Sequence, residues 1–180
     1  MVGPMPLQYV GDLISAWYTR TRGEFLSSYV DPILLGIGVL DVRLLRNPRR
    51  KVGTPYLGFE KRAPIGDTPP PLVGAIIPVV ARKGKSQRKL LVGRAATSDV
   101  VVDDPSVSEA HCSLERRGDT MLVTDLGSTN GTLINGTPVE PSRSQALSSG
   151  DILTLGRHSF KFFTAEGLYD YLQLNLGSGR

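Results

Sequence analysis

Short apolar runs separated by polar loops fill the chain from residue 73 to residue 163. Each run has the length and the β-branched or aromatic content of a strand, at residues 73–82, 89–92, 100–102, 112–115, 121–124, 132–134, 137–139, 152–155 and 159–163. The pair Asn135-Gly136 joins two of these runs and is the strongest short signal for a β-hairpin. Pro78 interrupts the first run, which favours a strand at a sheet edge. The pattern predicts a mainly β fold, a two-sheet antiparallel β-sandwich.

Helical spacing marks both ends of the chain. Apolar residues recur every three or four positions between Val10 and Val30, and the pair Asp31-Pro32 ends the pattern because proline disfavours α geometry in the preceding residue. This predicts one amphipathic helix or two. We expect its apolar stripe to dock on the rest of the chain and cover Trp17, with binding of a partner protein as the alternative. Residues 165–174 predict a short C-terminal helix packed on the outside.

The segment between these helices and the strand-rich region is mixed in character. Residues 33–45 form an apolar run, interrupted by Asp41 and Arg43, that predicts one or two buried strands and is too short and too charged to span a bilayer. Five cations in residues 43–51 indicate a solvated linker or, alternatively, a nucleic-acid or acidic-lipid patch. The predicted organisation is a helical or mixed extension (1–52), a Gly/Pro-rich linker (53–71), the sandwich (72–165), and a C-terminal helix and tail (166–180).

Charge is unevenly divided along the chain. The 180 residues carry a formal net charge of +4, with nine Lys/Arg against six Asp/Glu in residues 1–70 and twelve against eleven in the remainder. The strand-rich part is therefore nearly neutral. An anion bound there would have to be held by local donors, because no general positive field surrounds it.

The single cysteine limits the chemistry that the chain can support. Cys112 excludes an intramolecular disulfide and a cysteine-based metal cage, and its position within a strand pattern indicates a small buried apolar residue. The first residues lack a basic region followed by an apolar run, so we expect no secretory signal. These features predict a cytoplasmic protein with no cofactor and no metal.

Three polar clusters lie in the loops between predicted strands. They are Gly93-Arg94, Ser108–His111 and Gly127–Thr132. Loops held by a rigid sheet commonly position functional side chains. Together with Leu147–Asp151 and Leu155-Gly156, in this order and at these spacings, the clusters resemble a forkhead-associated (FHA) domain over about residues 72–165.

The resemblance implies a β-sandwich module that binds phosphothreonine peptides and is not an enzyme. Carried over by motif, Arg94, Ser108 and Thr129 hold the phosphate, while Asn130 holds the main chain of the ligand. These residue types suit the task, because an arginine fork and hydroxyl donors match a phosphate group with nearly two negative charges and three acceptor oxygens.

The same resemblance implies that the remaining motif residues have structural roles. The histidine, His111, braces the loops. Gly93, Gly127 and Gly131 permit backbone turns that a Cβ would hinder.

One position departs from the family pattern. The residue after the motif serine commonly is arginine, lysine or asparagine in this family and assists binding of the peptide. Here it is Glu109, which the resemblance places with Asn130 at the main chain of the peptide. A carboxylate about 4 Å from a phosphate is repulsive by about 1 kcal/mol in water, which would weaken binding without abolishing it. The pair Asp103-Asp104 adds negative charge to a neighbouring loop. Taken alone, Arg94 could instead be a surface ion-pair residue, with Asp99 or Asp103 as its partner.

Other function classes remain open at this point. Ser108 and His111 could form a nucleophile and a base, but they lie three residues apart across a turn, and no nucleophile elbow, zinc spacing or phosphate-binding loop occurs. A phosphate-independent interaction scaffold, working through the sandwich face or the N-terminal helix, is the stronger alternative. The expected partner is a phosphothreonine-containing protein, a Ser/Thr kinase or its substrate. We expect neither nucleic acid nor a membrane as a partner.

Overall fold

The computed structural model describes residues 8–39, 72–81, 89–118 and 120–176. The helices are α1 (Val10–Thr19), α2 (Arg22–Ser28) and α4 (Ala165–Leu176). The strands are β1 (Gln8–Tyr9), β2 (Ile33–Val39), β3 (Ala75–Pro78), β4 (Lys89–Gly93), β5 (Val100–Val101), β6 (Cys112–Arg117), β7 (Thr120–Asp125), β8 (Thr132–Ile134), β9 (Thr137–Pro138), β10 (Ser144–Leu147), β11 (Ile152–Leu155) and β12 (His158–Phe163). The basic run 43–51 and the Gly/Pro-rich segment 53–71 lie outside the described residues.

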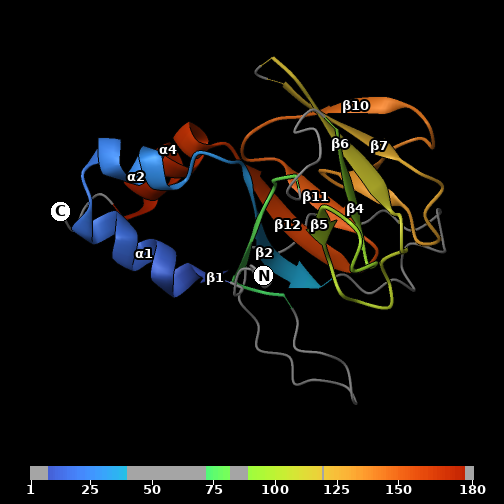
Figure 1. Cartoon of the computed structure of the whole chain (residues 1–180), viewed down its shortest axis with the longest axis horizontal. Coiled ribbons are helices and arrows are strands. Elements are labelled where there is room, and N and C mark those ends of the chain that lie inside the picture. The colour runs from blue at the N-terminus through green and yellow to red at the C-terminus, as the bar shows by residue number, and fades with distance from the viewer. Residues whose placement is uncertain (1–7, 40–71, 82–88, 119, 177–180) are drawn as a thin grey trace.

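The strands form two sheets packed face to face (Figure 1). One sheet has the order β1-β3-β2-β12-β11-β8-β9, and the other has the order β10-β7-β6-β4-β5. Side chains of both sheets meet in one buried cluster, in which Leu34 and Phe162 of the first sheet pack with Val92 and Leu114 of the second. The predicted mainly β sandwich is confirmed.

Strand directions follow the prediction with one exception. Among the described strands, every neighbouring pair is antiparallel apart from β4 and β5, which run parallel with Val92 opposite Val100. The turn that follows Gly93 returns the chain beside the strand that it has just left. Asp99 closes this turn, since its amide donates to the carbonyl of Leu91 and its carboxylate accepts from the Leu91 amide at 2.9 Å.

The first sheet includes a strand from the front of the chain. β2 lies between β3 and β12 and pairs with β12 from Ile33 opposite Phe163 to Val39 opposite His158. Its side chains alternate, because Leu34 faces the core between the sheets while Ile33 and Leu35 face the outer side. A sandwich confined to residues 72–165 is therefore too short a description of the sheet. The apolar run predicted as buried strands supplies one of its interior strands.

Gly36 permits this strand to pass close to another segment. A Cβ at this position would lie 1.6 Å from the carbonyl oxygen of Leu72, and the Gly36 carbonyl accepts from the amide of Gly74 at 2.7 Å. Close backbone approach is a usual reason for glycine inside a strand. This contact fixes β2 against the start of β3.

Helices α1, α2 and α4 form a helical cap on the outer face of the first sheet, at one side of the sandwich (Figure 1). Trp17 is fully buried there, and its ring centroid lies 5.9 Å from that of Phe25 and 4.6 Å from that of Tyr169. Helix α2 begins with a capping box between Thr21 and Glu24, which separates it from α1. The prediction of two docked N-terminal helices covering Trp17 is confirmed.

Several elements differ from the sequence-based expectation in extent. Strands β1 and β10 were not predicted, and the strand with Pro78 lies one place inside the sheet edge, next to the two-residue β1. Helix α4 extends two residues beyond the predicted end, to Leu176. Among the described residues, no helix is both long and apolar enough to cross a membrane.

Candidate functional site

The three polar clusters meet at one end of the sandwich. The registers place Val92 opposite Cys112 and Cys112 opposite Asp125. The end of β4, the start of β6 and the end of β7 therefore lie side by side. The loops attached there, residues 93–99, 104–111 and 125–132, are called the loop end below.

Arg94 is anchored at its backbone and at its guanidinium. Its amide donates to the carbonyl of Ser108 at 2.9 Å, and its Nε donates to the carbonyl of Val107 at 3.3 Å. The preceding Gly93 is needed for this contact, because a Cβ there would lie 2.1 Å from the carbonyl oxygen of Glu109. The side chain of Arg94 remains 41% exposed. Its guanidinium is thus held in place and accessible to solvent.

Ser108 and Thr129 lie beside each other although they come from different loops. The Ser108 Oγ accepts from the Thr129 amide at 3.0 Å, and the two hydroxyl oxygens are 3.4 Å apart. Because Ser108 also holds the Arg94 backbone, a guanidinium and two hydroxyls are collected within one small region. The three residues to which the resemblance assigns phosphate binding therefore lie together.

Asn130 joins the second and third loops. Its Nδ2 donates to the carbonyl of Ser106 at 2.8 Å, and its side chain is half-buried. The flanking Gly127 and Gly131 both adopt a φ of +79°, a left-handed conformation that favours glycine. The loop is thereby held in one conformation.

His111 is a fully buried brace between two of the loops. Its Nδ1 accepts from the Ser108 amide at 3.0 Å, and its Nε2 lies 3.1 Å from the carbonyl oxygen of Gly131, to which Nε2–H donates. Both contacts are satisfied by the neutral ring protonated at Nε2. Burial lowers the pKa of His111, which favours this neutral form.

This arrangement excludes His111 as a base for Ser108. The lone pair of Nδ1 accepts from the backbone amide of Ser108, so it is not available to the Ser108 hydroxyl. The other ring nitrogen contacts Gly131. The nucleophile–base reading of these two residues is therefore wrong.

Asp125 organises the third loop and was missed by the sequence analysis. Its carboxylate is almost fully buried and accepts from the amides of Gly127 and Ser128 at 2.8 and 3.0 Å and from the hydroxyls of Ser128 and Thr132 at 2.6 Å each. Burial alone would raise the pKa of Asp125, but these hydrogen bonds outweigh burial and hold the pKa below its usual value. The signal was present, since an aspartate two residues before a glycine is typical of a loop that folds around a carboxylate.

Asp104 holds the second loop to the β11–β12 hairpin. It accepts from the Ser106 amide at 2.8 Å and from Arg157, whose Nε lies 3.1 Å away, and His158 Nε2 lies 2.9 Å from the same carboxylate. Burial would raise the pKa of Asp104, but the hydrogen bonds from His158, Ser106 and Arg157 outweigh it and lower the pKa. The expectation that Asp104 adds negative charge beside the site is thus wrong, because Arg157 pairs with it, whereas Asp103 is exposed.

Arg94 does form an ion pair, but not with the partners proposed from the sequence. Its Nη2 lies 3.6 Å from Oε1 of Glu109, whose side chain is 76% exposed. Asp99 instead binds the backbone of β4. Glu109 therefore neutralises the exposed cation of the loop end in the free protein.

The loop end is suited to bind an anion with several acceptor oxygens. It offers one permanent cation and two hydroxyls, with a half-buried amide nearby, on loops that the buried side chains of His111 and Asp125 hold in place. Such donors match a phosphate monoester. Among residues 8–39, 72–81, 89–118 and 120–176, no group of three or more His, Cys, Asp or Glu could hold a metal ion.

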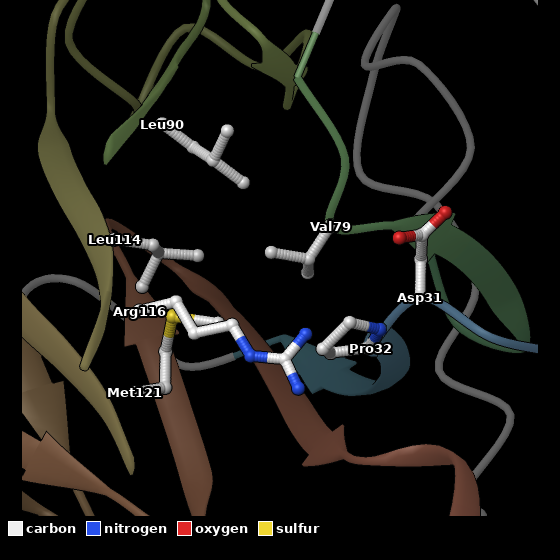
Figure 2. Close-up of a pocket in the computed structure, with 7 residues that line it drawn as sticks. All are labelled: Asp31, Pro32, Val79, Leu90, Leu114, Arg116 and Met121. Atoms are coloured by element: carbon white, nitrogen blue, oxygen red, sulfur yellow. The ribbon is translucent and has the colours of Figure 1, made fainter. Parts of the chain in front are cut away.

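A separate hollow lies at the opposite end of the sandwich (Figure 2). It measures about 130 Å³ and is lined mainly by apolar side chains, with Arg116 crossing it toward Pro32. The registers place Arg116 opposite Met121, away from the ends of β6 and β7 that adjoin the site loops. A small-molecule pocket is typically about 300–1,000 Å³, so this hollow is not the candidate site.

Comparison with known proteins agrees with the geometry. The family model described as FHA domain matches residues 90–156. The chain is 40% identical over 76 residues to the oxoglutarate dehydrogenase inhibitor of Corynebacterium jeikeium, covering 42% of this chain and 51% of that protein. It is 36% identical over 103 residues to the protein of the same name from Corynebacterium diphtheriae, covering 53% of this chain and 69% of the relative.

A solved structure is also similar to this chain over more than half of its length. The N-terminal FHA domain of Rad53p from S. cerevisiae, determined with a phosphothreonine peptide, is 26% identical to this chain at a TM-score of 0.44, covering 59% of this chain and 93% of that domain. The chain spans 51% and 69% of the two curated relatives described above.

Proposed function

This chain belongs to the FHA family, and we propose that it is a non-catalytic adaptor module that binds phosphothreonine in a partner protein. The observation that carries the proposal is the convergence of the Arg94 guanidinium with the hydroxyls of Ser108 and Thr129. These donors come from three loops that buried side chains hold together.

The proposed roles follow from the donors that each residue presents. Arg94 offers a permanent cation, and charge-assisted hydrogen bonds to phosphate are the strong ones. Ser108 and Thr129 offer hydroxyl donors to the remaining phosphate oxygens. Asn130 keeps a carboxamide oxygen and a second amide hydrogen beyond its contact with Ser106, and these suit the main chain of an extended peptide.

The partner in this proposal is a protein phosphorylated on threonine, either a Ser/Thr kinase or a kinase substrate. The two Corynebacterium relatives are named as inhibitors of oxoglutarate dehydrogenase, which favours a partner that is itself an enzyme. We place the interaction in the cytoplasm. The single cysteine supports this placement, since it is buried and unpaired and the fold uses no disulfide.

The test compares one peptide in two forms. A threonine peptide and its phosphorylated twin are titrated against the wild type and Arg94→Ala by isothermal calorimetry. We expect binding of the phosphorylated form only, and a loss of about 1.5–3 kcal/mol with Arg94→Ala, which is at least tenfold in affinity. A library of phosphothreonine sequences supplies the peptide.

Arg117→Ala is the matched control, because Arg117 is an exposed, ion-paired arginine at the other end of β6. It should leave affinity unchanged. If the wild type binds both peptide forms equally and Arg94→Ala has no effect, the chain is a phosphate-independent scaffold that uses another surface.

A further inference from the structure

We propose that Glu109 makes the site selective for phosphothreonine peptides with a lysine or arginine close to the phosphothreonine. The inference rests on the proposed function and concerns the sequence class of its ligand. In the free protein Glu109 pairs with Arg94. When the phosphate pairs with Arg94, the carboxylate of Glu109 is released and can bind a cationic side chain of the peptide.

The backbone of Glu109 is fixed at the edge of the site. Its carbonyl accepts from the Ala95 amide and from the Ser98 hydroxyl, both at 3.3 Å. The same carbonyl packs against Gly93 so closely that a Cβ there would lie 2.1 Å from it. The carboxylate can therefore change its contacts by side-chain rotation, but the residue cannot leave the rim of the site.

The contact between Glu109 and Arg94 is easily displaced. The two side chains are 76% and 41% exposed, and their closest charged atoms are 3.6 Å apart. Exposed ion pairs of this kind contribute little because water and salt screen them. A phosphate dianion brings more charge and three acceptor oxygens to the same guanidinium, so it replaces the carboxylate.

Displacement removes the counter-charge that Glu109 has among the described residues. Among the residues that the structure describes, Arg94 is the cation that pairs with it. Arg157 and His158 are engaged with the buried Asp104 and do not compensate Glu109. An exposed carboxylate beside a bound dianion repels it, unless the ligand brings a positive charge to the same place.

The distance that the Glu109 carboxylate can reach limits the position of the cationic residue in the peptide. Since Arg94 contacts both groups, Glu109 stays within a few ångströms of the phosphate. An extended peptide advances about 3.3–3.6 Å per residue, so the cation lies within roughly two residues of the phosphothreonine. An acidic residue at the same position would add to the repulsion.

The experiment is a charge-exchange cycle with defined peptides. One phosphothreonine peptide with alanine at the two positions on each side is the reference, and each of the four positions is replaced in turn by lysine and by glutamate. All are titrated against the wild type, Glu109→Gln and Glu109→Lys at low salt. Glu140→Gln is the control, because Glu140 is a similarly exposed carboxylate in the loop before β10.

We expect one position at which the wild type prefers lysine over glutamate by about three- to tenfold. Glu109→Gln should abolish this preference and bind the reference peptide a few times more tightly, while Glu109→Lys should reverse the preference. Raising the salt concentration should reduce it, because exposed charges are screened. Glu140→Gln should behave as the wild type.

Two results would overturn the inference, and they differ from a failure of the proposed function. If binding depends on phosphate and on Arg94 but shows no lysine preference at any position, Glu109 does not select peptides by their charge. The same conclusion follows if the preference persists in Glu109→Gln. If binding does not depend on phosphate at all, the proposed function fails, and the inference fails with it.

Discussion

The helical cap and the loop end are stabilised by different kinds of contact. In the cap, Trp17, Phe25 and Tyr169 pack ring against ring over the outer face of the sheet. In the loop end, most of the buried side chains are polar, and Asp125 and His111 hold backbone amides and hydroxyls at fixed distances. Apolar packing tolerates rearrangement better than a buried hydrogen-bond network does, so the cap stabilises the fold while the loop end determines the geometry of binding.

The largest effect is expected from removal of β2, which connects the cap with the sandwich. A chain that begins at Pro71 lacks this interior strand and leaves β3 and β12 unpaired on that side, so we expect it not to fold. A chain that begins at Asp31 keeps β2 and loses α1, α2 and the two-residue edge strand β1, so it should retain the rest of the first sheet with reduced stability. Circular dichroism and urea unfolding distinguish the two. A cooperative transition in the shorter chain would contradict the role given to β2.

Trp17→Ala separates stability from binding in the cap. We expect a loss of about 3–5 kcal/mol in the free energy of unfolding, because a large side chain is removed from a fully buried position. Phosphopeptide affinity at low temperature should not change. The neighbouring Tyr18→Ala is the control, since Tyr18 is 47% exposed and should cost little. A parallel loss of affinity in Trp17→Ala would show that the cap and the loop end are coupled.

Asp125→Ala is expected to reduce both stability and phosphopeptide affinity, unlike Trp17→Ala. Removal of this acceptor leaves buried donors of the third loop unsatisfied, at about 1–3 kcal/mol for each one that water cannot reach. We expect a loss of about 2–4 kcal/mol in stability together with at least a tenfold loss of phosphopeptide affinity. Asp103→Ala removes an exposed carboxylate from the neighbouring loop and should leave both quantities nearly unchanged. Full affinity in Asp125→Ala would show that Thr129 does not depend on this network.

A smaller effect is expected from pH through His111. Its pKa in the folded protein is below the usual value of 6.5, so the unfolded chain binds a proton more readily. The stability from the neutral ring is complete above pH 6.5 and declines as the pH falls toward the folded pKa, by at most about 1.4 kcal/mol per pH unit. Urea unfolding between pH 5 and 8 measures this slope. His111→Gln should flatten it, and an unchanged slope would assign the proton uptake to another group.

The sequence predicts the strands of the sandwich well because their apolar residues are continuous or alternate. It does not predict β10, whose sequence Ser144–Leu147 is half polar without an alternating pattern and which becomes a strand by pairing with β7. The position of β2 was also not predictable. Its apolar run indicates a buried strand, but the choice of β3 and β12 as neighbours depends on contacts between residues about 43 and about 130 positions apart.

Some residues of the site could be predicted from the sequence and others could not. Arg94, Ser108 and Thr129 were found because the resemblance assigns each motif position. The buried roles of Asp125 and Asp104 were not found, because a carboxylate in a polar loop usually lies on the surface. The pairing of Glu109 with Arg94 needs the fold, since the pairing of β4 with β6 brings together two loops that are separate in the sequence.

The place of β2 also has a consequence for how the protein is made. Ile33 pairs with Phe163, about 130 positions later in the chain, so the interior of the first sheet cannot form until residue 163 has been synthesised. At about 5–20 residues per second, β2 and the N-terminal helices wait on the order of ten seconds for β12. Pairing over such a separation also slows folding, because a long loop must close before the contact forms. During that interval the apolar face of β2 is exposed, which makes the nascent chain a candidate for chaperone binding.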